Sequence, residues 1–390
     1  MAVRRRGCLL VPLGALLLVL SLCRSVGGAE QGLEDILQEQ LSQVDASEID
    51  RWLEEWRQSL GREFPAVSWR DAVEVVRGRG VFIDVPALLR ALAAHVGREL
   101  VASARLLVQL LALGIVAAFL GQLELSPGRG DVARVGGWAC FAGVALLAVT
   151  CFAQALQLAQ ATVRDAVTFM QAILLPLTSL LAASGAPVSA GLLHPLAMLL
   201  VQGGAVLVAD LVFPLLAIAA LLEVATLSVG SSLEGPGSLL RQVAFAVLGG
   251  FLAILLWAMS AKRVAGQVAD SVALRTAKFL SGAFVPVVGK MLGDAVEMVF
   301  TSSLILRRAL GLIGVLGVFL AMATPVIKLA CLVLLWRTGA VLAGAVGTTQ
   351  SSRLMNAMAG ALLYLLLPLL ALGVLFAACL GQLAAVALPY

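Results

Sequence analysis

Long apolar runs without a single charged side chain dominate the pattern along this chain. Residues 135–163, 166–209 and 354–390 contain no Asp, Glu, Lys or Arg. A helix needs about 20 predominantly apolar residues to cross a bilayer, so the second and third runs are each long enough for more than one crossing. The pattern therefore predicts an all-α protein that passes through a membrane several times.

The apolar runs divide into about eight candidate spans and two less regular segments. Of the latter, residues 166–185 are long enough to cross, whereas residues 279–300 are interrupted by proline, glycine and charged residues. Such an interruption is tolerated at membrane depth only against protein or a wet cavity, so this segment is expected to be re-entrant, interfacial or cavity-lining. The candidate spans are residues 102–122, 136–158, 192–212, 214–231, 242–261, 305–324, 326–346 and 359–386.

The first 29 residues have the pattern of a secretory signal peptide. Three arginines at positions 4–6 precede the apolar run 7–23, and small residues follow at 27–29. A basic start, an apolar centre and small residues at a cleavage site are typical of such peptides. An uncleaved signal anchor is the alternative, and a lipoprotein with Cys23 as the lipidated residue is a third possibility.

A polar region separates the signal peptide from the membrane part. Residues 30–99 hold 14 of the 23 acidic residues, and capping patterns predict short helices in the region 30–98. About seventy residues are few for an independent core, so we expect this domain to lean on the membrane part or on partners. The first span and the loop after it occupy 99–134, and a C-terminal span occupies 356–390.

The composition supports a membrane protein and contains no pattern typical of a metal, disulfide or nucleic-acid site. Apolar residues make up 61% of the chain and charged residues only 13%, whereas a soluble protein carries about 25% charged residues. The six cysteines form no C-x-x-C pair and no cluster with histidine. No basic run with interleaved aromatics indicates nucleic-acid binding. We expect no cofactor, no metal site and no nucleic-acid partner.

The positions of the basic residues predict an orientation. With the domain 30–98 outside the cytoplasm and eight crossings, ten basic residues of the short connections fall inside and three outside. Positive charge favours the cytoplasmic side. We therefore expect the domain 30–98 to lie outside the cytoplasm and residues 262–308 to face inside.

The membrane part also suggests an internal repeat. When the sequence is shifted by 110 residues, Pro176 coincides with Pro286, and with one inserted residue Pro214 coincides with Pro325. Two units are predicted, at about 135–245 and 245–355. If the proline segments do not cross, each unit has three spans and the copies are inverted, as in many transporters. If they cross, the copies are parallel.

Ionisable residues inside the spans are the first candidates for function, because they are costly at membrane depth. Asp210 and Glu223 flank Pro214, and Lys328 and Arg337 flank Pro325. One interpretation pairs acids with bases across the axis of the repeat, to line a pathway or lock the halves together. The other places each residue at an interface, where its side chain reaches the lipid headgroups.

The remaining polar residues do not form a catalytic motif. His194 and Pro195 begin a span, which indicates a helix start more than proton handling, and His95 is expected at a surface. No G-x-S-x-G, H-E-x-x-H or P-loop pattern is present. We predict that the protein is not an enzyme.

One motif resembles a known family. Residues 274–295, LRTAKFLSGAFVPVVGKMLGDA, strongly resemble the most characteristic region of the stage III sporulation protein AE family. The resemblance covers essentially the whole chain. Shorter matching pieces are Leu175–Pro176 running to 182–185, His194–Pro195, Phe213–Pro214 and Pro325 to Lys328.

The resemblance implies a role in endospore formation. Members of this family look like multispanning components of a channel apparatus that joins mother cell and forespore. The implied partners are other membrane subunits of that complex, ring-forming proteins and a cytoplasmic secretion-type ATPase. The implied location is the mother-cell membrane that surrounds the forespore. A self-sufficient secondary transporter and a membrane scaffold that recruits partners are the alternatives.

The resemblance also points to a functional segment, although it supplies no catalytic residue. Pro286 and Gly289 would interrupt a helix at membrane depth, and Lys290 and Asp294 are spaced to pair on one helical face. An amphipathic interfacial helix is the alternative. The residues that match the family's motif, and which we expect at the functional centre, are Arg275, Lys278, Phe279, Pro286, Gly289, Lys290 and Asp294.

Overall fold

Helices make up the computed structural model of this chain. The structure describes residues 51–52, 54–55, 58, 69–76, 85–124, 130–229, 234–284, 286–345 and 349–386. The predicted signal peptide and most of the predicted domain 30–98 lie outside these residues. The regular elements among the described residues are all helical, which confirms the all-α class.

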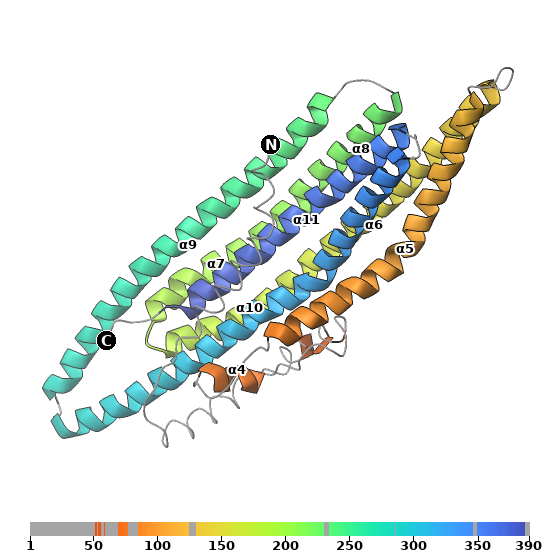
Figure 1. The fold of residues 1–390 in the computed structure, drawn as a ribbon. Helices are drawn as coiled ribbons and strands as arrows, with labels where there is room; N and C mark the ends of the chain where they lie inside the picture. The colour runs from red at the N-terminus through yellow and green to blue at the C-terminus, as the bar shows by residue number, and fades with distance from the viewer. Residues whose placement is uncertain are drawn as a thin grey trace.

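A polar helix, α4, precedes a bundle of much longer helices (Figure 1). One long rod is composed of three consecutive elements, α7, η1 and α8, in which η1 is a stretch of π-helix. The elements are α4 (Trp69–Val76), α5 (Val85–Glu124), α6 (Gly130–Ala183), α7 (Pro187–Val206), η1 (Leu207–Val212), α8 (Phe213–Val229), α9 (Glu234–Phe284), α10 (Pro286–Ala345) and α11 (Thr349–Ala384).

Neighbouring candidate spans join into single helices, so the count of about eight spans is not confirmed. Residues 136–158 and 166–185 both belong to α6 and its end, and 305–324 and 326–346 both belong to α10. In the described part of the chain, five helices are long and apolar enough to cross a membrane. They are Val135–Ala183, Pro187–Leu227, Pro236–Thr276, Met298–Ala345 and Gln350–Ala384.

Proline does not end these helices where the sequence suggested it would. Pro176 lies inside α6 and Pro325 inside α10. Neighbouring helices can satisfy the backbone groups that proline frees. Pro286, in contrast, is the first residue of α10, where its missing N–H costs nothing. The two prolines that coincide when the sequence is shifted therefore occupy different positions, one inside a helix and one at a helix start, and the internal repeat is not confirmed.

Helix α10 packs closely against its neighbours at a row of three glycines. We call Gly311, Gly314 and Gly317 the glycine ridge. A Cβ added at Gly314 would lie 2.9 Å from Cδ1 of Leu380 in α11. Cβ atoms at the other two positions would collide with Ala384 of α11 and with the ring of Phe169 in α6. Small residues let helix backbones approach closely, which is how helices associate in lipid.

The described end of the polar domain lies at the same end of the bundle as the connection between α9 and α10. Helix α4 packs against α10, and Figure 1 shows it beside the part of α10 nearer that connection. Four long rods, an even number, separate the two in sequence: α5, α6, the α7–α8 rod and α9. This arrangement places the described end of the domain 30–98 and the α9–α10 connection at one end of the bundle, whereas the sequence led us to expect opposite sides. The side of the membrane that each of them faces stays a prediction.

The glycine ridge predicts a specific sensitivity to added methyl groups. We expect Gly317→Ala to lower the stability of the purified full-length protein by about 1–3 kcal/mol, because its Cβ would overlap the Phe169 ring. Gly249→Ala is the matched control, because nothing lies within 4 Å of its Cβ position, and the better helix propensity of alanine should leave stability equal or higher. Thermal unfolding in detergent measures both. An unchanged Tm for Gly317→Ala would contradict the close approach.

The arrangement also predicts which residues share a side of the membrane. Cysteines replacing the exposed Glu74 in α4 and Arg275 in α9 should react with an impermeant thiol reagent from the same side. A cysteine at the exposed Arg353, near the opposite end, should react only from the other side. Labelling of intact protoplasts against opened membranes distinguishes the sides. Reaction of the first two positions from opposite sides would overturn the arrangement.

Candidate functional site: a buried polar cluster at one end of the bundle

Polar side chains are buried together where α6, α7, α9, α10 and α11 meet. We call Ser184, Ser189, Asp270 and Arg307 the polar cluster. Asp270 and Arg307 are each 1% exposed and Ser189 is fully buried. Buried charges are stable only when partners satisfy them, so the contacts of this cluster define how the surrounding helices are joined.

The cluster is built around the turn between α6 and α7. Gly185 has a φ of 86°, a left-handed conformation that glycine adopts without strain. The N–H of Ala186 donates to the carbonyl of Leu181 (3.3 Å), and that of Gly185 donates to the carbonyl of Ala182 (3.2 Å). These two bonds form a Schellman motif, which ends α6. Pro187 then begins α7, so the turn is tight.

Asp270 of α9 caps the N-terminus of α7. Its two carboxylate oxygens accept hydrogen bonds from the N–H groups of Val188 (2.8 Å) and Ser189 (2.9 Å). The residue before α7, Ala186, provides no side-chain cap of its own. A carboxylate satisfies the first N–H groups of a helix and is favoured by the helix dipole. Gly266 makes the approach possible, because a Cβ there would lie 2.6 Å from Oγ of Ser189.

Arg307 of α10 binds the ends of two other helices. Its Nη1 donates to Oγ of Ser184 (2.8 Å) after α6, and its Nη2 donates to the carbonyl of Val386 after α11. Both acceptors follow a helix C-terminus, where a positive charge is favourable. Asp270 and Arg307 thus carry the charge that each contacted helix end favours.

The cluster holds the two helices that lead into and out of one connection. Asp270 lies four residues before the motif 274–295, and Arg307 lies twelve residues after it. Phe300 covers the turn as well, because its ring lies 3.1 Å from the Cβ position of Gly185. The α9–α10 connection is therefore fastened on both sides to the α6–α7 turn.

Comparison with known proteins assigns the chain to a family. The family described as "Stage III sporulation protein AE" matches residues 67–387. The chain belongs to the stage III sporulation protein AE family. It is 28% identical over 361 residues to "Stage III sporulation protein AE" of Bacillus subtilis (strain 168), which covers 90% of each chain. No solved structure matches.

Membership of the family confirms the resemblance seen in residues 274–295 and agrees with several membrane-spanning helices. Arg275 is exposed on α9. Pro286, Gly289, Lys290 and Asp294 belong to the first turns of α10 by their backbone, and Lys278 and Phe279 to the last turns of α9. The side chains of these six lie outside the described part of the structure, so their expected role stays a prediction.

His194 bridges α6 and α7 close to the polar cluster. Its Nδ1 lies 3.2 Å from Oγ1 of Thr178, two residues after the half-buried Pro176 on α6. Pro195 is exposed. Thr178 also donates to the carbonyl of Leu174 (2.8 Å). The helix begins at Pro187, so the expectation that His194 and Pro195 begin it is wrong; His194 lies two turns inside α7.

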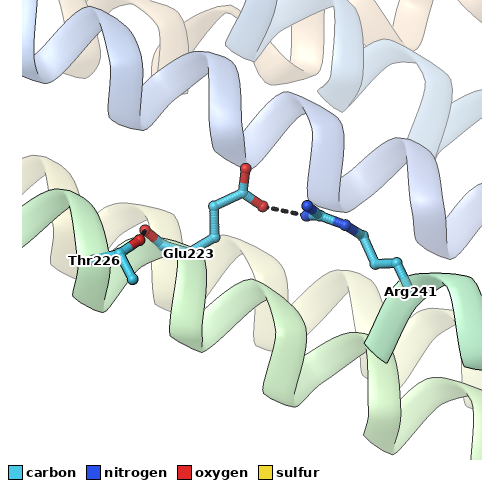
Figure 2. Close-up of polar contacts among 3 residues, drawn as sticks. All are labelled: Glu223, Thr226 and Arg241. Atoms are coloured by element: carbon cyan, nitrogen blue, oxygen red, sulfur yellow. Dashed lines mark hydrogen bonds and ion pairs between the residues drawn. The ribbon is translucent and has the colours of Figure 1, made fainter. Parts of the chain in front are cut away.

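Glu223 has a partner that the proposed pairing across the repeat did not include. It forms an ion pair with Arg241 of α9, and Thr226 donates to its backbone carbonyl (2.9 Å) (Figure 2). The Arg241 guanidinium also lies 5.0 Å from the ring centre of Tyr364. The pairing of Glu223 with a base beside Pro325 is therefore wrong.

The other predicted positions within the spans are separate from the cluster. Asp210 is exposed in η1 and Lys328 is exposed in α10. Pro214 is exposed and Pro325 is buried. Within the described residues, no group of three or more His, Cys, Asp or Glu side chains could hold a metal ion.

Asp270 and Arg307 were not singled out from the sequence. A signal existed for Asp270, because it is the only acidic residue between Glu234 and Asp294. Arg307 gave no such signal, since Arg308 follows it and only the structure shows which of the two is buried.

The cap on α7 predicts a graded loss of stability. We expect Asp270→Ala to destabilise the protein by about 1–3 kcal/mol, because two buried N–H groups lose their acceptor. Asp270→Asn keeps one carbonyl oxygen, so its Tm should lie between that of Asp270→Ala and that of the native protein. Asp165→Ala is the control, because Asp165 is exposed on α6. Thermal unfolding of the full-length protein ranks the three. Equal Tm values for Asp270→Ala and Asp165→Ala would rule out the cap.

Proposed function

We propose that this chain is a channel-like, export-gate-like membrane subunit of the sporulation complex that connects mother cell and forespore. It works without catalytic chemistry of its own. The functional segment is the α9–α10 connection with the motif 274–295.

One observation carries the proposal: the buried polar cluster at one end of the bundle joins the helices that lead into and out of that connection to the α6–α7 turn. A chain that used its buried charges for chemistry would leave them open to a substrate. Asp270 instead binds two backbone N–H groups, and Arg307 binds a hydroxyl and a carbonyl at helix ends. Such contacts fix the geometry of a segment, as a gate or docking element requires.

The family suggests where the subunit works. We place it in the mother-cell membrane around the forespore, with its polar N-terminal domain outside the cytoplasm. Its partners would be other membrane subunits, ring-forming proteins and a cytoplasmic secretion-type ATPase. Because the polar domain and the α9–α10 connection share one end of the bundle, the connection would meet the ring-forming proteins, and the ATPase would act at the opposite end.

A self-sufficient transporter is the weaker reading. It depended on two inverted units with matching breaks, and α6 continues through Pro176 whereas α10 begins at Pro286. A scaffold that only recruits partners would not need its connection fastened on both sides.

The functional segment can be tested at two charges of α10. Lys290 and Asp294 are four residues apart in one helix, so they share a face. We expect Lys290→Met and Asp294→Leu each to abolish spore formation, because an unpaired charge at membrane depth costs about 2.5–3.5 kcal/mol. The double variant should recover membrane accumulation and part of the spore yield.

The controls separate function from folding. Arg275→Met removes an exposed charge of the same motif and should leave accumulation normal. Co-purification of the other subunits with each variant reports assembly. Normal spore yield in both single variants would contradict a functional segment at this position. Transport reconstituted from the purified chain alone would replace the proposal with a transporter.

A further inference from the structure

One exposed carboxylate lies in the middle of an otherwise uncharged face. Asp210 is the only charged residue between positions 166 and 222. It is exposed on the π-helix η1, and π-helical turns are frequent at functional sites. The apolar side chains around it are exposed too: Val206 by 59%, Leu211 by 42% and Ile218 by 50%. A charge on such a face is costly against lipid tails and needs a partner.

A basic residue of α10 is exposed within an apolar span. Lys328 is exposed, whereas Thr324, Pro325 and Leu332, which share its helix face, are half-buried or buried. The candidate span Met298–Ala345 contains both the lysine and these neighbours. Lys328, like Asp210, is therefore a charged residue that is costly against lipid tails and needs a partner. Its charge is opposite to that of Asp210.

Helix α11 shows that the two residues lie at the same height in the bundle. It contacts the α7–α8 rod at Gly204, whose Cβ position is 3.2 Å from Cδ1 of Leu372, and it contacts α10 at Gly373, whose Cβ position is 3.2 Å from Sδ of Met322. Gly204 and Met322 therefore lie at the same height along α11. Asp210 lies six residues after Gly204 on the rod, and Lys328 lies six residues after Met322 on α10.

The α7–α8 rod and α10 both run antiparallel to α11. Six residues further along either of them therefore lead toward the same end of the bundle. On the rod, Gln350 of α11 donates to the carbonyl of Leu227 (3.4 Å). On α10, Ser352 donates to the carbonyl of Ala340 (2.7 Å). Residues near the start of α11 thus meet the later part of each helix. Asp210 and Lys328 lie at equal depth.

The two charges lie on the two helices that flank α11. Helix α11 packs against both η1 and α10 and lies between the α7–α8 rod and α10 (Figure 1). Asp210 and Lys328 are both exposed, so neither is covered within one chain. Opposite, exposed charges at equal depth on two different helices suit a contact between two chains that stand side by side in one membrane.

We propose that a second copy of this chain binds there, with Asp210 of one copy paired to Lys328 of the next. A contact in which Asp210 of each copy pairs only with Lys328 of the next copy is heterologous, and it closes into a ring when the rotation permits. Equal depth is the condition for such a ring to have its axis along the membrane normal. The exposed apolar side chains around Asp210 would exclude water and lipid from the pair.

Cross-linking tests the pair directly in membranes that contain the full-length protein. With a short bis-maleimide, the double variant with Asp210→Cys and Lys328→Cys should give a ladder of covalent species at multiples of the mass of one chain. Each single variant should give at least tenfold less. The matched control joins Asp210→Cys with Arg337→Cys, an exposed base nine residues further along α10, and should give no ladder.

Each other result overturns the proposal. A cross-link within one chain would show an internal pair, and a cross-link only to a different protein would show a partner's basic helix. Labelling of both cysteines without any cross-link would show that lipid or water covers them. A control ladder equal to the test ladder would show random collision.

A second measurement does not depend on cysteines. The native protein in lipid nanodiscs should have a mass of several chains, and Asp210→Lys or Lys328→Asp alone should reduce the oligomeric fraction at least tenfold. The two reversals in one chain should restore it, because the pair is re-formed with its charges exchanged. A monomeric native protein, or no rescue, contradicts the proposal. Neither measurement requires sporulating cells, so its outcome is independent of the proposed function.

Discussion

The close approach of α10 to α6 and α11 at Gly311, Gly314 and Gly317 is the constraint on which the rest of the bundle depends. Lipid tails are as apolar as leucine, so helices in a membrane gain little from burying leucine against leucine. They gain from contacts that only small residues permit. With the backbone of α10 pressed against Phe169 and Leu380, the register of three long helices is determined. That register also sets the position of the helix ends.

The polar cluster follows from this register. Arg307 lies one turn before the glycine ridge and reaches the ends of both helices that the ridge contacts. Asp270 completes the arrangement from α9 by capping α7. Each charge satisfies a helix end that would otherwise bury unpaired backbone groups. The α9–α10 connection, which carries the motif of the stage III sporulation protein AE family, is thereby attached to a rigid part of the bundle.

The all-α membrane class and the family could be predicted from the sequence, but few of the tertiary contacts could. Uncharged runs such as 166–209 predict membrane helices, and the motif 274–295 predicts the family, because both are local patterns. The number of helices could not be predicted, since Pro176 and Pro325 read as breaks and are accommodated inside helices by their neighbours. The cap by Asp270 joins residues more than eighty positions apart, and no local pattern encodes such a contact.

The joining of neighbouring spans into long straight helices is the central claim, and one distance tests it. Spin labels at the exposed Val299 and Val341 lie on the same helix, α10, with Pro325 between them. A continuous helix rises about 1.5 Å per residue, so the account predicts a separation of about 60 Å by pulsed electron paramagnetic resonance. A helix that broke at Pro325 and crossed the bilayer a second time would bring the labels within about 30 Å, one bilayer core. That shorter distance would contradict the account.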